Sequence, residues 1–357
     1  MKKLIWFLVL AVLLAVAWLA WPMIAKAQVA EPAQVPTSLQ PYLSDETKVV
    51  WGGGEIANST YSRVMVPVVI DQLAKERLAG YQWGGPSAGT IENAIRVTLN
   101  PTHVALGQAD ILSRLNGQPI IIDGVDTGLT YNFTVVQPDI ADECLYLVTK
   151  SPYYETWGHV LENAWDITVA TGGDTSGSYG TLVGLQETYP DFQDALINSV
   201  GGTGDILQAV IDGDESTFGF FVMRPDPSSA TFKTIAEHEL TMVPVVDFDL
   251  EGKYEFNNLK VEQGGILSDP VYHDTACTQV QLITGSLANL DPNDRTYRRL
   301  EATIERASRT PAAEFKQAVM SKVTNWRDYL DNVKAVGQER LLVLMEDSKQ
   351  AVGGAAN

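Results

Sequence analysis

Glycines and hydroxyl-bearing residues recur in the same order at two places in the chain, about 117 residues apart. Gly52-Gly-Gly54 precedes Ser59-Thr-Tyr61 in the first copy, and Gly172-Gly173 precedes Ser176-Gly-Ser178-Tyr179 in the second. The matched pairs keep nearly one offset: 118 residues for Tyr61 and Tyr179, 117 for Gly84 and Gly201, and 116 for Gln108 and Arg224. Glycine-rich turns leave backbone amides uncovered, and a hydroxyl residue that begins a helix stands beside its free amides and the positive end of its dipole. Such groups suit a carboxylate or another small anion.

The ligand contacts predicted from this pattern are Gly53, Ser59, Thr60, Tyr61, Ser87, Thr90, Gln108, Ser176, Ser178, Tyr179, Thr203 and Arg224. Arg224 ends an apolar run, and its guanidinium matches a carboxylate; the alternative is a surface ion pair with Asp226 or Asp214. Gln108 is its neutral counterpart in the first copy. For the two tyrosines the alternative is packing of the first helical turn, and Ser87, Thr90 and Thr203 also fit simple helix caps.

The elements that position these residues alternate between strands and helices. Strands are expected at 48–51, 79–83, 103–106, 166–170, 197–200 and 217–222, and each is followed by a glycine-rich or polar turn. Ligands bind beyond the carboxyl ends of the strands in open parallel sheets, so two such lobes would face each other across a cleft. The predicted fold class is therefore α/β, with two lobes and a cleft between them.

We expect a first lobe at 46–147, joined by the returning segment 250–290, and a second lobe at 150–245, with crossings near 144–149 and 242–246. Residues 291–357 are predicted to form C-terminal helices. Phe315, Val319 and Val323 begin an apolar stripe at steps of three and four, which we expect to pack on the first lobe. The alternative is a surface for self-association or transporter docking.

The first residues predict export. Lys2 and Lys3 precede an apolar stretch that ends in Ala25-Lys-Ala27, the pattern of a signal peptide cleaved after Ala27. Residues 28–45 then form a flexible lead-in, and the expected location is the periplasm. The alternative is a membrane anchor that stays uncleaved, because about 20 apolar residues can also span a bilayer.

Cys144 and Cys277 are the two cysteines of the chain, and each lies in a strand-like run. Export into an oxidising compartment makes one disulfide plausible. Two buried free thiols are the alternative, because sequence does not show proximity.

Composition narrows the function classes. The chain has 357 residues, a net charge of −19 and 45% hydrophobic residues, which argues against intrinsic disorder and against broad contact with nucleic acid. The four histidines are dispersed, no nucleophile–base pair is evident, and Gly173–Gly180 lacks the lysine of a P-loop. We therefore expect no metal, no cofactor and no enzymatic activity.

The motifs resemble those of type II periplasmic solute-binding proteins, and more narrowly the TAXI class of solute receptors for TRAP transporters. The resemblance covers roughly residues 46–290 and rests on Gly52-Gly-Gly, Ser59-Thr-Tyr61, the run 84–93, Val104–Asp110 and Gly177-Ser-Tyr179. The chain departs from the family pattern at Glu55 and in its longer tail after Asp291.

The resemblance implies an extracytoplasmic receptor that closes on an acidic amino acid or dicarboxylate and delivers it to TRAP-type membrane subunits. Two other functions stay open: a periplasmic ligand sensor, and a secreted enzyme that uses the same cleft.

Overall fold

The computed structural model describes residues 35–54, 61–225, 229–261, 272–288 and 290–324. The chain divides into two units, residues 1–41 and 42–357. In the first unit, the Gln40 side chain donates a hydrogen bond to the Val35 carbonyl at the start of the 3-10 helix η1 (Thr37–Tyr42). The second unit contains the predicted repeats and is described below by itself.

The first lobe of this unit is built on three parallel strands in the order β2 (Gln82–Trp83), β1 (Val49–Trp51) and β3 (Val104–Gln108). Their connections are a short π-helix and three α-helices: η2 (Tyr61–Met65), α2 (Val66–Lys75), α3 (Thr90–Leu99) and α4 (Ala109–Leu115). The π-helix ends at Met65 and α2 begins at Val66, so Pro67 lies in the first turn of α2, where its missing N–H costs no helical hydrogen bond. A hairpin of β4 (Pro119–Ile122) and β5 (Val125–Thr130) follows.

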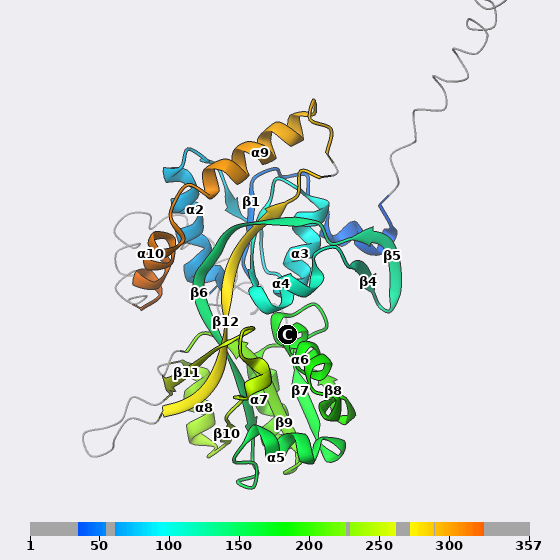
Figure 1. Cartoon of the computed structure of the whole chain (residues 1–357), viewed down its shortest axis with the longest axis vertical. Coiled ribbons are helices and arrows are strands. Elements are labelled where there is room, and N and C mark those ends of the chain that lie inside the picture. Colours follow the sequence, from blue (N-terminus) through cyan, green and yellow to red (C-terminus); the bar gives the residue numbers. More distant parts are fainter. Residues whose placement is uncertain (1–34, 55–60, 226–228, 262–271, 289, 325–357) are drawn as a thin grey trace, which may run out of the picture. The chain divides into compact units, whose positions relative to one another are not determined.

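The second lobe repeats this plan with three parallel strands in the order β8 (Leu196–Ser199), β7 (Thr168–Thr171) and β9 (Thr217–Met223). Their connections and flanking segments are α5 (Trp157–Glu162), η3 (Ala164–Asp166), α6 (Gly177–Thr188), η4 (Pro190–Asp194), α7 (Thr203–Asp212), α8 (Ala230–Glu237) and η5 (Phe248–Leu250). The two-lobed α/β fold class expected from the sequence is confirmed by this arrangement (Figure 1).

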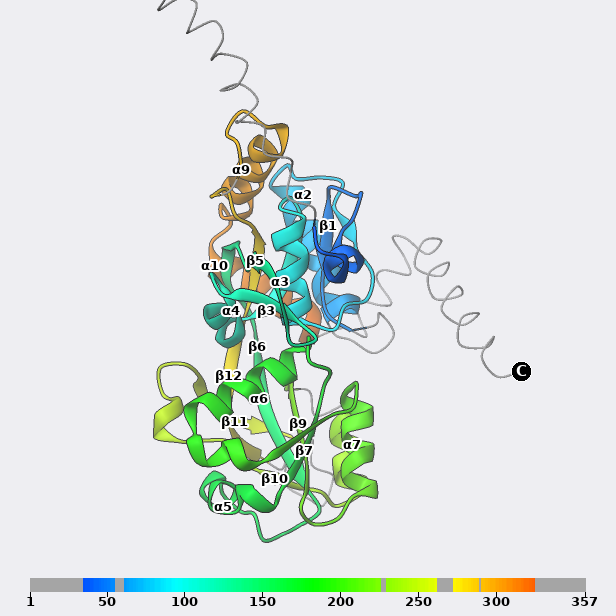
Figure 2. The same cartoon turned by 90° about the vertical axis from the view of Figure 1, so that its right-hand side faces the viewer.

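Two long antiparallel strands, β6 (Phe133–Thr149) and β12 (Tyr272–Gly285), run through both lobes (Figures 1 and 2). β12 pairs with β3 in the first lobe, whereas the later half of β6 pairs with β9 in the second. β10 (Thr241–Val243) pairs with residues 147–149 of β6, and β11 (Glu255–Lys260) pairs with β12. We expected the chain to cross back to the first lobe near 242–246, but β12 makes this crossing instead. The exact limits of the lobes stay a prediction, because both lobes share these strands.

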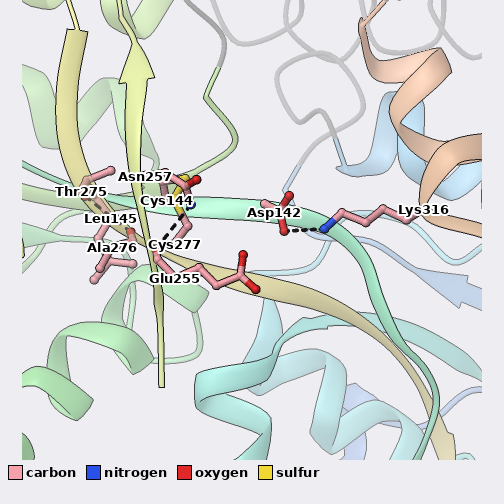
Figure 3. Close-up of a disulfide and its surroundings, with 9 residues drawn as sticks. All are labelled: Asp142, Cys144, Leu145, Glu255, Asn257, Thr275, Ala276, Cys277 and Lys316. Carbon is pink, nitrogen blue, oxygen red and sulfur yellow. Dashed lines mark hydrogen bonds and ion pairs between the residues drawn. A yellow bond between two sulfur atoms is a disulfide. The ribbon is translucent and has the colours of Figure 1, made fainter. Parts of the chain in front are cut away.

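Cys144 and Cys277 face each other in the β6–β12 register and form a disulfide (Figure 3). The bond joins the two strands near the point where both pass from one lobe to the other. The structure therefore has the disulfide that the sequence left open.

Separate apolar clusters fill the two lobes. Leu73, Leu106 and Leu282 belong to the cluster of the first lobe, and Trp157 and Phe192 belong to a cluster of the second. A third cluster, around Tyr146 and Phe221, lies on the other face of the second lobe's sheet. Since each lobe buries its own core, the interface between them is free to carry polar groups.

The helices α9 (Arg295–Ala307) and α10 (Ala312–Thr324) pack on the first lobe. Phe315 and Val319 are buried in its core. Lys316 pairs on β6 with Asp139 at 2.9 Å and with Asp142 at 2.8 Å, and Figure 3 shows the second of these pairs. The rest of the expected apolar stripe, from residue 325 on, lies outside the described residues, as does the expected signal peptide. Among the residues that the structure describes, no helix combines the length and the hydropathy needed to span a membrane.

Candidate ligand site between the lobes

Backbone segments of the two lobes meet where the predicted glycine turns lie. The amide of Gly54, after β1, donates to the Ser87 carbonyl at 2.6 Å, and the amide of Glu92 donates to the Thr175 carbonyl of the second lobe at 3.3 Å. A Cβ on Gly89, whose φ is +132°, would lie only 2.9 Å from the backbone nitrogen of Gly177. The beginnings of α3 and α6 are thus in contact, each with its positive dipole end at the interface.

Gln108, at the end of β3, lies at the centre of this contact. Its amide oxygen accepts from the Thr90 hydroxyl at 3.2 Å, and its backbone nitrogen donates to the same hydroxyl at 3.1 Å. Its side-chain nitrogen donates to Oε2 of Glu143 at 3.0 Å. A Cβ on Gly177 would collide with Gln108 Oε1, so only glycine lets the second lobe approach this closely. Gln108 therefore links a helix start of each lobe to an acid on β6.

Glu143 is the buried acid of the site, with 4% of its surface exposed. Burial raises the pKa of Glu143 to about 8, against the opposing effect of the hydrogen bond from Gln108, and Asp110 raises it further. Burial and the neighbouring Glu143 also raise the pKa of the Tyr61 hydroxyl. A carboxyl group with this pKa is mostly protonated at pH 7, so the floor of the site is close to neutral there.

Most of the described residues that we predicted as ligand contacts are located at the lobe interface or at helix starts. Gly53 lies beside Gly89, and Ser87 is buried with a hydroxyl that has no hydrogen-bond partner in the described part of the chain. Ser176 is the N-cap of α6 and accepts from the Tyr179 amide at 3.1 Å. Ser178 accepts from the Val222 amide at 3.0 Å, which ties α6 to β9. The hydroxyl oxygens of Ser176 and Ser178 thus each already accept a hydrogen bond from a backbone amide of the protein.

Four of the predicted ligand contacts remain to be placed: Ser59, Thr60, Thr203 and Arg224. Ser59 and Thr60 lie outside the described residues. Thr203 begins α7, and no described hydrogen bond joins it to the first lobe. Arg224 directly follows β9 and is partly buried. The joining of Gln108 and Arg224 by one ligand stays a prediction.

Sequence reasoning missed three polar residues of this region, the buried Glu143 and Asn93 and the partly buried Asp110. Asn93 donates to the carbonyls of Gly52, at 2.5 Å, and Leu106, at 2.8 Å, and so fixes the turn after β1. An available signal for Glu143 was an acid directly before a long apolar run, Cys144–Val148.

Among the described residues, no three His, Cys, Asp or Glu side chains gather so that they could hold a metal ion. A hollow of about 430 Å³ lies elsewhere in the second lobe, where its lining includes Leu240, Met242 and His273. The hydrogen bonds between the lobes, and not this hollow, mark the site that the sequence pattern predicts.

No protein-family model and no curated protein matches the chain. Solved structures resemble it at low identity. MatC from Rhodopseudomonas palustris with bound malate has a TM-score of 0.41 and 15% identity, over 80% of this chain and 99% of that one. Rpa4515 of R. palustris with adipate has a TM-score of 0.40 and 11% identity, over 79% and 95%. The amino acid ABC transporter substrate-binding protein AbpA from Streptococcus pneumoniae, bound to L-arginine, has 0.39 and 10%, over 78% and 94%. These likenesses assign the chain to no family and to no ligand.

Proposed function

We propose that the protein is an extracytoplasmic solute receptor that captures a small carboxylate-bearing solute by closure of its two lobes. The observation that carries the proposal is the meeting of the starts of α3 and α6, one from each lobe, at Gln108. A solute held there would be enclosed by both lobes and would contact backbone amides and hydroxyls from each.

The charge of the site fits this class of solute. Helix starts favour an anion, and the raised pKa of Glu143 keeps its carboxyl mostly uncharged at neutral pH. Arg224 is the cationic side chain that we propose as the partner of a solute carboxylate from the second lobe. An acidic amino acid or a dicarboxylate satisfies these groups best.

Delivery to the membrane subunits of a TRAP-type transporter, membership of the TAXI class and a periplasmic location complete the proposal. Their support is the sequence resemblance together with the signal-peptide pattern that ends at Ala27. A ligand sensor is the second candidate, because closure of the same lobes could signal to a partner instead of a transporter. A secreted enzyme has less support, since we identify no nucleophile–base pair among those interface residues that the structure describes.

Replacing Arg224 by alanine should weaken solute binding by about thirtyfold or more, roughly 2 kcal/mol, because a buried solute carboxylate would lose its charged partner. The test is calorimetric titration of wild type and variant with L-glutamate, L-aspartate, L-malate and 2-oxoglutarate. Arg224→Lys should retain part of the affinity, and Lys233→Ala, at an exposed position on α8, should retain all of it. An unchanged dissociation constant in Arg224→Ala would remove Arg224 from the site.

A further inference from the structure

Helix α6 turns a face of three glycines toward the first lobe. Gly177, Gly180 and Gly184 are spaced by three and four residues, so they lie on one side of the helix. A Cβ on Gly180 would lie 2.9 Å from Cδ1 of Ile111, and one on Gly184 would lie 2.9 Å from Cζ of Arg114. Side chains at these positions would displace Ile111 and Arg114 from their contacts with α6, so the glycines permit this close packing.

Asp110, near the start of α4, accepts hydrogen bonds from three hydroxyl groups. Its Oδ2 accepts from Thr181 on α6 at 2.7 Å and from Tyr254, directly before β11, at 2.9 Å. Its Oδ1 accepts from Thr278 on β12 at 3.0 Å. All three donor residues are buried. Hydrogen bonds from hydroxyls to a carboxylate are short and strong. In the closed form, hydroxyl groups of the protein therefore take the place of water around the Asp110 carboxylate.

Arg114, in the last turn of the same helix α4, makes a second group of contacts with α6. Its Nη1 pairs with Oε2 of Glu187 at 2.9 Å, and its Nη2 donates to the Gly180 carbonyl. None of Asp110, Arg114, Thr181 and Tyr254 is among the residues that we propose to hold solute. The contacts of α4 are thus separate from the solute contacts around Gln108.

We propose that α4 and α6, with Tyr254, form a closure latch that holds the two lobes together without solute. The latch consists of Asp110 and Arg114 on the first lobe and of Thr181, Glu187 and Tyr254 on the second, packed across the glycine face. Its effect on affinity rests on the proposed function: a solute that binds the closed form binds more weakly when less of the protein is closed.

The sharpest test removes the two second-lobe donors and keeps their shapes. The double variant Thr181→Val, Tyr254→Phe leaves the partly buried Asp110 short of hydrogen-bond partners when the lobes are closed, whereas water satisfies it more fully when they are open. The solute-free double variant should have a larger radius of gyration by small-angle X-ray scattering than solute-free wild type. Thr188→Val is the matched control on α6, because the Thr188 hydroxyl donates to Gly184 of its own helix and accepts from Lys253, and both partners belong to the second lobe. It should scatter as wild type does.

Identical scattering of the solute-free double variant and the solute-free wild type would overturn the latch. Titration with L-glutamate and L-malate forms the second readout, with an expected loss of about tenfold in apparent affinity in the double variant. If the variant opens but neither solute binds either protein, the latch stands and the proposed ligand class fails. A melting temperature close to that of Thr188→Val shows that the double variant is folded.

Discussion

Removal of the Cys144–Cys277 disulfide should lower the free energy of unfolding by about 5 kcal/mol. The two residues are 133 positions apart, and a cross-link of that span restricts the unfolded chain strongly. The double variant Cys144→Ala, Cys277→Ala and the reduced wild type should therefore unfold at similar, much lower denaturant concentrations than the oxidised wild type. Urea unfolding followed by tryptophan fluorescence measures this difference.

The thiol state is checked on the same samples. Alkylation of denatured but unreduced wild type should label neither cysteine. Labelling of both residues, or equal stability of the oxidised and reduced proteins, would contradict a structural disulfide at this position. Because the bond joins the two strands shared by the lobes, we expect its loss to affect both lobes in one transition.

Replacing Glu143 by glutamine should stabilise the protein at neutral pH and flatten its pH dependence. The pKa of Glu143 is about 8 in the folded state against an ordinary value of 4.5, so the folded protein retains a proton that the unfolded chain releases between these values. Its contribution to stability is full below pH 4.5 and is lost as pH rises toward 8. The loss is on the order of 3 kcal/mol by pH 7. A glutamine stays neutral throughout and can still accept from Gln108.

Thermal unfolding of both proteins at several values between pH 5 and pH 8.5 measures this effect. The difference in stability between Glu143→Gln and wild type should be smallest at pH 5 and should grow toward pH 8. Glu237→Gln is the matched control, because Glu237 is exposed on α8 and should change neither the stability nor its pH dependence. A constant difference across this range would show that Glu143 has an ordinary pKa.

The short parallel strands could be predicted from the sequence, because each is an apolar run that ends in a glycine-rich or polar turn. The segments at 48–51, 166–170 and 217–222 correspond to β1, β7 and β9. The helix starts at Thr90 and Ser176 could likewise be predicted, since a hydroxyl residue within a few positions of a glycine turn is a local signal. These features depend on neighbours in sequence.

The long strands and the acids of the interface could not be predicted in this way. β6 includes Asp139, Asp142 and Glu143, which interrupt its apolar pattern. Lys316 of α10 pairs with the first two, and Gln108 of β3 donates to the third. Partners so far away in the sequence leave no local pattern. Asp110 is of the same kind, since its three hydroxyl donors come from α6, the approach to β11, and β12.

The central claim is that a small carboxylate-bearing solute binds between the lobes around Gln108. Native mass spectrometry of protein exported by its host and purified without refolding tests this claim most directly. We expect an additional small-molecule mass that is lost on denaturation and is reduced in Arg224→Ala. Equal masses under native and denaturing conditions, with no rise in melting temperature on addition of L-glutamate, L-aspartate, L-malate or 2-oxoglutarate, would contradict it.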